Sequence, residues 1–139
     1  MAISYRYDTD KNMMWSSVTG TLTTEDIIAH IDRLFENNIR LQGLIEMIDM
    51  NRVGDVIIRH SDLFAIREKT AQLAQSGHKI SIVFCSVPRG KEILQVMGPI
   101  FNQITVTVHI CDTPEEALAY ADALVYTRSD IDGSEKKGA

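Results

Sequence analysis

The sequence predicts an α/β protein with a mixed five-stranded sheet and about four helices. Three observations lead to this prediction. The chain opens with two β-prone segments around a cluster of turn formers. Helix-like and strand-like segments then alternate, in the order β-β-α-β-α-β-α-β-α. The later strand segments are short and mostly apolar, which is typical of strands buried on both faces. Together these features predict an N-terminal hairpin followed by parallel strands joined by right-handed crossovers.

The opening hairpin is predicted from side-chain alternation and turn chemistry. Residues 3–8 alternate, with one isoleucine and two tyrosines on one face. Turn formers occupy residues 8–12, and residues 13–18 resume an extended run. Met13, Met14 and Trp15 make this second run apolar. They are core residues, or a partner-binding surface if one sheet face lacks helix cover.

Two helices follow from apolar residues at helical spacing. The first is predicted from about Thr24 to Asn37, where a threonine caps the start and acidic residues favour the positive end of the helix dipole. The second begins at Ser61, interpreted as an N-cap, and ends at the Ser76–Gly77 stop. Between them, residues 43–50 predict a buried central strand that ends at Asp49.

Two further strand and helix pairs complete the domain. Residues 51–59 have no assigned structure, and residues 79–85 and 105–111 predict the fourth and fifth strands. A third helix starts at Pro88 and is expected to kink or split at Gly98–Pro99. The last helix starts at a capping box that runs from Thr113 through Pro114 to Glu116.

Length and composition limit the protein class. We expect residues 1–126 to form a single domain and residues 127–139 to form a flexible tail, since 139 residues suit one core. The net charge of −5 argues against nucleic acid as a partner. The two cysteines suggest a reduced, cytoplasmic protein, and neither a signal peptide nor a membrane span is recognisable.

Four segments in this order resemble the SpoIIAA-like superfamily, which includes the STAS domains of sulfate transporters and anti-sigma-factor antagonists. They are residues 18–26 (Val-x-Gly-x-Leu-Thr-x-Glu-Asp), 47–50 (Met-Ile-Asp-Met), 79–83 (Lys-Ile-x-Ile-Val) and 109–118 (His-Ile-Cys-Asp-Thr-Pro-Glu-Glu-Ala-Leu). The resemblance covers residues 3–125, and its best match is the stand-alone bacterial branch. It implies a right-handed β-α superhelix with the strands in sequential order. It also implies a relation to CRAL-TRIO lipid-binding domains, which share this core.

The resemblance makes Ser61 a candidate phosphorylation site, with one departure from the family pattern. Phosphorylatable antagonists carry an Asp-Ser-Ser-Gly-like motif at the start of the second helix. Residues 58–63 read Ile-Arg-His-Ser-Asp-Leu, so only Ser61 corresponds. Ser61 is therefore either a helix cap or a phosphosite, where new negative charge at a helix N-terminus is favourable.

The candidate binding site lies where parallel strands end and loops meet. Its basic members would bind an anionic headgroup, a phosphate or a phosphoserine peptide. The alternative is that they are solvated loop cations, some of them paired with nearby aspartates. The candidate ligand- or partner-binding residues are Asp49, Arg52, Arg59, His60, Ser61, Arg89, Lys91 and Asp112.

Other reactive residues favour structural roles. The four histidines show no metal-ligand spacing, and no cofactor motif is recognisable, so neither a metal nor a cofactor is expected. Cys85 and Cys111 are expected to be buried neighbours at strand ends. A catalytic triad of Ser61 or Cys85 with His60 and Asp49 can be drawn, but no nucleophile elbow supports it.

Three functional hypotheses remain open. The first is a non-catalytic STAS-like regulatory or protein-interaction module, whose partner uses residues 49–61 and which self-associates as a homodimer through its hairpin. The second is a small binding protein for a lipid-like or anionic ligand, with a cavity beneath Met97, Ile100 and Phe101 of the third helix. The third is a hydrolase-type enzyme centred on Ser61 or Cys85.

Overall fold

The computed structural model describes residues 2–78, 80–102, 104 and 106–124. A helix over residues 114–124 follows the last strand. The other elements are β1 (Ile3–Asp8), β2 (Met13–Thr23), α1 (Thr24–Glu36), β3 (Ile45–Ile57), the 3₁₀ turn η1 (His60–Asp62), α2 (Leu63–Gln75), β4 (Ile80–Phe84), α3 (Pro88–Phe101) and β5 (Thr107–Cys111). The expected boundary at residue 126 and the tail beyond it lie outside the described residues.

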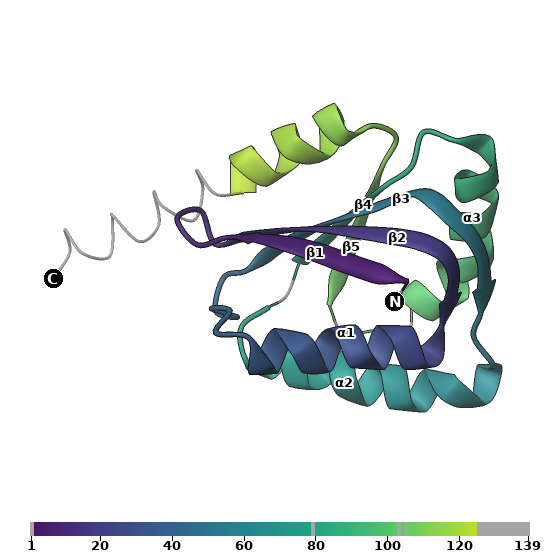
Figure 1. Ribbon diagram of the computed structural model, residues 1–139, viewed down its shortest axis with the longest axis horizontal. Coiled ribbons are helices and arrows are strands. Elements are labelled where there is room, and N and C mark those ends of the chain that lie inside the picture. The colour runs from purple at the N-terminus through teal and green to yellow at the C-terminus, as the bar shows by residue number, and fades with distance from the viewer. Residues whose placement is uncertain (1, 79, 103, 105, 125–139) are drawn as a thin grey trace, which may run out of the picture.

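The sheet has five strands in the sequential order β1-β2-β3-β4-β5 (Figure 1). β1 pairs with β2 in antiparallel fashion, and every later pair is parallel. This confirms the predicted mixed sheet, its opening hairpin and its α/β class. Successive side chains of each strand point to opposite faces of the sheet, and residues paired in neighbouring strands share a face.

Helices cover both faces of this sheet. α1 and α2 lie side by side on one face, and the 114–124 helix lies on the opposite face (Figure 1). α3 packs on the same face as α1 and α2, where Ile93, Leu94 and Met97 join strand residues in one apolar cluster. On the opposite face, Ala117 and Ala121 of the last helix are buried against the sheet.

Capping explains where the first and last helices start. The Thr23 hydroxyl accepts the backbone N–H of Asp26 at 3.2 Å, and the Asp26 carboxylate accepts the backbone N–H of Thr23 at 3.0 Å. At the last helix, the Thr113 hydroxyl accepts the backbone N–H of Glu116 at 3.1 Å. Both predicted N-termini are therefore confirmed, since each satisfies backbone donors that a helix leaves free.

The central strand is longer than the sequence indicates. β3 continues through the unassigned stretch to Ile57, paired only with an equally extended β2 beyond Asp49. Gly20 adopts a positive φ of 73° beside a register shift, and Gly54 lies opposite it. The two strands can bend here because glycine tolerates this backbone conformation and leaves room for close approach.

The structure differs from two local predictions about helices. α2 begins at Leu63, and Ser61 lies inside η1 instead of capping the helix. The adjacent Asp62 carboxylate instead accepts the Arg59 backbone N–H and the Thr24 hydroxyl, which ties η1 to α1. α3 continues through Gly98–Pro99 to Phe101, so the helix is not split at this proline.

The apolar residues of the hairpin belong to the core. Met13 and Met14 are buried on opposite faces of β2. Trp15 is half-buried, and its ring centroid lies 5.4 Å from that of Phe84. The core interpretation of the two methionines is therefore confirmed, and Trp15 is the member that keeps some exposed surface.

Candidate functional site

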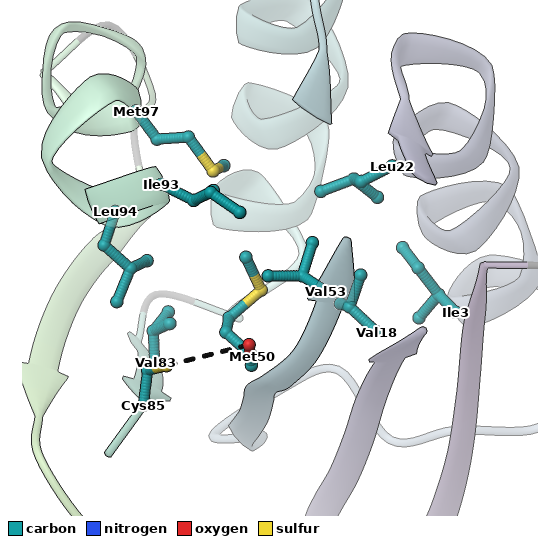
Figure 2. Close-up of a cluster of buried hydrophobic side chains, with 10 residues drawn as sticks. All are labelled: Ile3, Val18, Leu22, Met50, Val53, Val83, Cys85, Ile93, Leu94 and Met97. Atoms are coloured by element: carbon teal, nitrogen blue, oxygen red, sulfur yellow. Dashed lines mark hydrogen bonds between the residues drawn. The ribbon is translucent and has the colours of Figure 1, made fainter. Parts of the chain in front are cut away.

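A cavity of about 140 Å³ lies between the sheet and the layer formed by α1, α2 and α3. Its walls are almost entirely apolar. The strands contribute Ile3, Val18, Leu22, Ile48, Met50, Val83 and Val108, and the helices contribute Ile27, Ile31, Ile66, Leu73 and Met97. Figure 2 shows Met97 and Leu22 pointing toward each other from α3 and β2 at one end of this interior.

Ile48 marks the open space in the middle of the sheet. It lies on the central strand, paired with Ser16 on one side and Val83 on the other. A central-strand residue on a helix-covered face is normally fully buried, yet Ile48 is only half-buried. Its incomplete burial agrees with the cavity in front of it.

A single carboxylate interrupts the apolar wall. Glu46 is the second residue of β3, and only 4% of its surface is exposed. Its Oε2 accepts a hydrogen bond from the Ser16 hydroxyl at 2.7 Å and lies 2.6 Å from Nε2 of His30. A carboxylate can only accept, so the His30 ring donates to it. Both partners come from elements that flank β3, namely β2 and α1.

His78 approaches the other oxygen of Glu46. Its Nδ1 donates to the backbone carbonyl of Leu44 at 2.9 Å. Its Nε2 lies 3.4 Å from the Ser81 hydroxyl and 3.8 Å from Oε1 of Glu46, which is beyond hydrogen-bond distance. His78, Ser81 and Glu46 are all buried. We define Ser16, His30, Glu46, His78 and Ser81 as the polar cluster. All of its members except Ser16 line the cavity, where Thr70 is a further polar lining residue.

Arg33 continues this cluster toward the N-terminal strand. Its guanidinium donates to the backbone carbonyl of Ile3 at 3.0 Å and lies 3.4 Å from Nδ1 of His30. It also lies 5.5 Å from the centre of the Tyr5 ring, within cation–π range. Its buried Nε has no hydrogen-bond partner among the described residues. Arg33 thus holds the His30 ring from the side opposite to Glu46.

The partners of Glu46 keep it ionised. Burial by itself would raise the pKa of Glu46, because a charged carboxylate loses its hydration. Three neighbours outweigh this effect of burial. His30 attracts the carboxylate and donates a hydrogen bond to it, His78 attracts it, and the Ser16 hydroxyl donates a second hydrogen bond. Together they lower the pKa of Glu46 from 4.5 to about 2. At neutral pH, the cavity therefore contains a carboxylate anion.

The sequence reasoning missed this cluster. It examined the histidines only for metal-ligand spacing and did not select Glu46. A usable signal was the glutamate inside the apolar run of residues 43–50, since charged residues are almost never fully buried without partners. The cluster also lies near the amino ends of β3 and β4, whereas the predicted site lies at their carboxyl ends.

The predicted rim residues lie on several elements of the fold. Lys91 and Asp112 meet at 3.2 Å between α3 and the end of β5, and both are exposed. Arg59, His60 and Ser61 are exposed around η1. Among the described residues, no hydrogen bond or ion pair joins these two groups.

The other rim candidates lie in or next to regular elements. Asp49 accepts the backbone N–H of Asn51 at 2.8 Å, and Arg52 lies in the extended part of β3, opposite Thr19. Arg89 lies in the first turn of α3, and its side chain is outside the described part of the chain. Asp49 is half-buried and Arg52 is exposed, so the rim candidates differ in exposure and are spread along several elements.

Two large apolar residues are exposed beside η1. Ile57 ends β3 and is 55% exposed, and Phe64 in the first turn of α2 is 69% exposed. Exposed aromatic and large aliphatic residues are common in protein-contact surfaces. We call Ile57, Phe64 and the intervening η1 the η1 surface.

The two cysteines and His109 make local structural contacts. Cys85 and Cys111 are free and buried, and the Cys85 backbone N–H donates to the Cys111 carbonyl at 3.2 Å. The predicted burial of these two neighbours is confirmed. Burial, with the nearby Glu116 and Asp112, raises the pKa of the Cys111 thiol. The His109 ring is exposed and stacks on Tyr120, with centroids 3.9 Å apart.

Within the described residues, no three His, Cys, Asp or Glu side chains converge as a metal site would require. The Cys85 sulfur contacts the carbonyl oxygens of Met50 and Val87. The triad drawn from the sequence is therefore not assembled around Cys85 in this part of the chain. No helix in the described ranges is both long enough and apolar enough to cross a bilayer.

No protein-family model matches the chain, and no curated protein does. Among solved structures, an uncharacterised protein of the DUF3478 family with a SpoIIAA-like fold, from Shewanella loihica PV-4, is similar. It is 14% identical with a TM-score of 0.54, and the match covers 86% of this chain and 92% of that protein. The anti-sigma factor antagonist SpoIIAA in its unphosphorylated form matches with 16% identity and a TM-score of 0.47, covering 91% of this chain and 98% of that protein. The similarity to the first of these structures, over 86% of this chain, shows that this chain has a SpoIIAA-like fold.

Proposed function

We propose that this protein is a non-catalytic binding module whose cavity takes up a small, mainly apolar molecule. The observation that supports this proposal best is the apolar cavity of about 140 Å³ in front of the half-buried Ile48. Native cores rarely leave such a volume empty, because lost packing costs about 24 cal/mol per Å³ of residual cavity. A bound molecule would restore those contacts.

The volume of the cavity limits the size of its ligand. Pockets for drug-sized ligands measure about 300–1,000 Å³, whereas an apolar cavity of about 150 Å³ accepts benzene. The cavity therefore suits a single ring, a short branched chain or one end of a longer molecule. Of the lipid-like ligands expected from the sequence, only the smaller ones therefore fit inside the cavity.

The arrangement of the polar cluster supports binding over catalysis. In a nucleophile–base–acid relay, the acid and the nucleophile contact different nitrogens of the same histidine. Here Ser81 and Glu46 both face Nε2 of His78, and Nδ1 donates to a backbone carbonyl. Free buried cysteines further support a cytoplasmic location for this module.

Filling the cavity tests the proposal. Replacing Ile48 by phenylalanine places a larger side chain in the space, and we expect binding of toluene to be lost. The control is Ile110→Phe, at an exposed position of β5, which should leave binding unchanged. Toluene titrations followed by amide NMR shifts measure both, and toluene should raise the melting temperature of the wild type and of the control. Equal toluene binding by the wild type and Ile48→Phe would contradict the proposal.

A second candidate function is protein interaction through the η1 surface, supported by the exposure of Phe64 and Ile57. A regulatory SpoIIAA-like module would present its partner with this surface, and Ser61, exposed within it, would be the phosphorylation site. The sequence hypothesis of a STAS-like interaction module therefore remains a proposal, together with homodimer formation. Native mass spectrometry would report the subunit count and any bound small molecule together.

Substitutions on the η1 surface test this second candidate. Phe64→Ser should weaken binding to a partner isolated from the native host at least about 30-fold, because a central aromatic anchor contributes about 2 kcal/mol or more. Ser61→Asp should also change the affinity, by adding charge at the same surface. Leu118→Ser, on the opposite face, is the control. A partner that binds Phe64→Ser and the wild type equally would exclude this surface.

A further inference from the structure

We propose that the cavity ligand carries one hydrogen-bond donor, a hydroxyl or an amine, and that Oε1 of Glu46 accepts the hydrogen bond from this group. This inference rests on the proposed binding function and specifies the chemistry of its ligand. It assigns to Glu46 the role of orienting an otherwise apolar molecule.

The two oxygens of Glu46 differ in their partners. Oε2 has short contacts with both Ser16 and His30, at 2.7 and 2.6 Å. Oε1 has no hydrogen bond among the described residues, and Nε2 of His78 is 3.8 Å away. Glu46 is buried except for 4% of its surface, and Oε1 is not among the fully buried side-chain atoms that lack a partner in the described residues. This oxygen is therefore accessible from the cavity that Glu46 lines.

An acceptor of this kind should have a donor in its final environment. Buried polar atoms are nearly always hydrogen-bonded, and an unsatisfied charged group is especially unfavourable. Glu46, His30, His78 and Ser81 all line the cavity, so a molecule inside it can reach this side of the wall. Either a water molecule or a donor group of a ligand can supply the missing hydrogen bond to Oε1. A ligand that displaces the water preserves this hydrogen bond only if the ligand itself carries a donor.

The neighbouring groups indicate which ligand charge is accepted. The Nδ1 hydrogen of His78 is already used by the Leu44 carbonyl, and Nε2 of His30 is used by Glu46. An anionic ligand would place a second negative charge beside the carboxylate, and the two charges would repel each other. The cavity therefore selects neutral or cationic donors and rejects carboxylates.

Three probes of nearly equal size test the inference: toluene, phenol and aniline. Each probe is a single ring with one added heavy atom, so differences in affinity between them measure the effect of the hydrogen-bond donor. We expect phenol and aniline to bind at least about tenfold tighter than toluene, since a hydrogen bond to a charged group contributes about 1.5–3 kcal/mol. Comparing phenol with aniline shows whether a hydroxyl or an amine is preferred, and benzoate should not bind.

Glu46→Gln is the matched variant. The amide oxygen can keep the bonds from Ser16 and His30, while the NH₂ group then takes the place of Oε1 and presents donors to the cavity. The advantage of aniline over toluene should disappear, while toluene binding stays unchanged. Glu68→Gln, which removes an exposed carboxylate from α2, should retain the wild-type preference.

The outcomes separate this inference from the proposed function. Equal affinity of the wild type for all three probes would overturn the donor inference and leave the binding proposal intact. Absence of binding by every probe would overturn both. If Glu46→Gln fails to fold, the ¹³C carboxyl resonance of Glu46 in the wild type should shift with aniline and phenol but not with toluene. An aniline preference that leaves this resonance unmoved would also overturn the inference.

Discussion

Replacing His30 by alanine is expected to lower the free energy of unfolding by about 3–5 kcal/mol, the usual effect of removing one partner from a buried ionic pair. His30 donates the 2.6 Å hydrogen bond to Glu46 and helps to keep that carboxylate ionised. Without the ring, Glu46 retains Ser16, but most of the compensation for its burial is lost. Urea unfolding at pH 7 measures the change.

The matched control for this experiment is His60→Ala. His60 is exposed in η1, and we expect its replacement to change stability by less than about 0.5 kcal/mol. A loss below 1 kcal/mol for His30→Ala would show that the His30–Glu46 contact does not stabilise the fold. Toluene binding by a folded His30→Ala variant would also show whether the shape of the cavity depends on this ring.

Acid should remove the stability that Glu46 contributes. The pKa of Glu46 falls from 4.5 to about 2 on folding, so the folded state favours the ionised carboxylate. The contribution of Glu46 to the free energy of unfolding is therefore complete above pH 4.5 and is lost as the pH falls toward 2. A shift of this size corresponds to roughly 3 kcal/mol. The stability difference between wild type and Glu46→Gln should therefore shrink by about that amount between pH 5 and pH 2.

The comparison with Glu46→Gln isolates this carboxylate from the other acidic groups, which titrate in both proteins. Urea unfolding of both at several pH values between 5 and 2 gives the difference directly. A constant difference across this range would mean that the pKa of Glu46 is not lowered by folding. Glu68→Gln should show no comparable change, because Glu68 is exposed.

Local sequence signals predicted most of the elements and their order. The helix starts at Thr23 and Thr113 follow from side chains that bond to backbone groups three residues away. The stop at Gly77, with a φ of 101°, is equally local. The extension of β3 to Ile57 was missed because it depends on pairing with β2, which no signal inside residues 51–57 reveals.

The polar cluster shows why the site itself could not be predicted. Ser16, His30, Glu46 and Ser81 come from four elements and are up to 65 residues apart in the chain. They meet because β2, β3 and β4 are adjacent and parallel, and because the register pairs Glu46 with Ser81. A shift of one residue in any of these strands would turn its side chain to the opposite face.

The sequence by itself determined the α/β class, the order of strands and helices and the SpoIIAA-like character of the chain. The class and the order of elements follow from the spacing of apolar residues and from capping groups, which act over a few residues. The SpoIIAA-like character was implied by the resemblance of four short segments to that superfamily. Only the tertiary structure decided that Glu46 is buried with His30 and His78, and that a cavity of about 140 Å³ lies beside them. Burial and cavity volume depend on how three helices pack on one sheet face, and no short stretch of sequence encodes that packing.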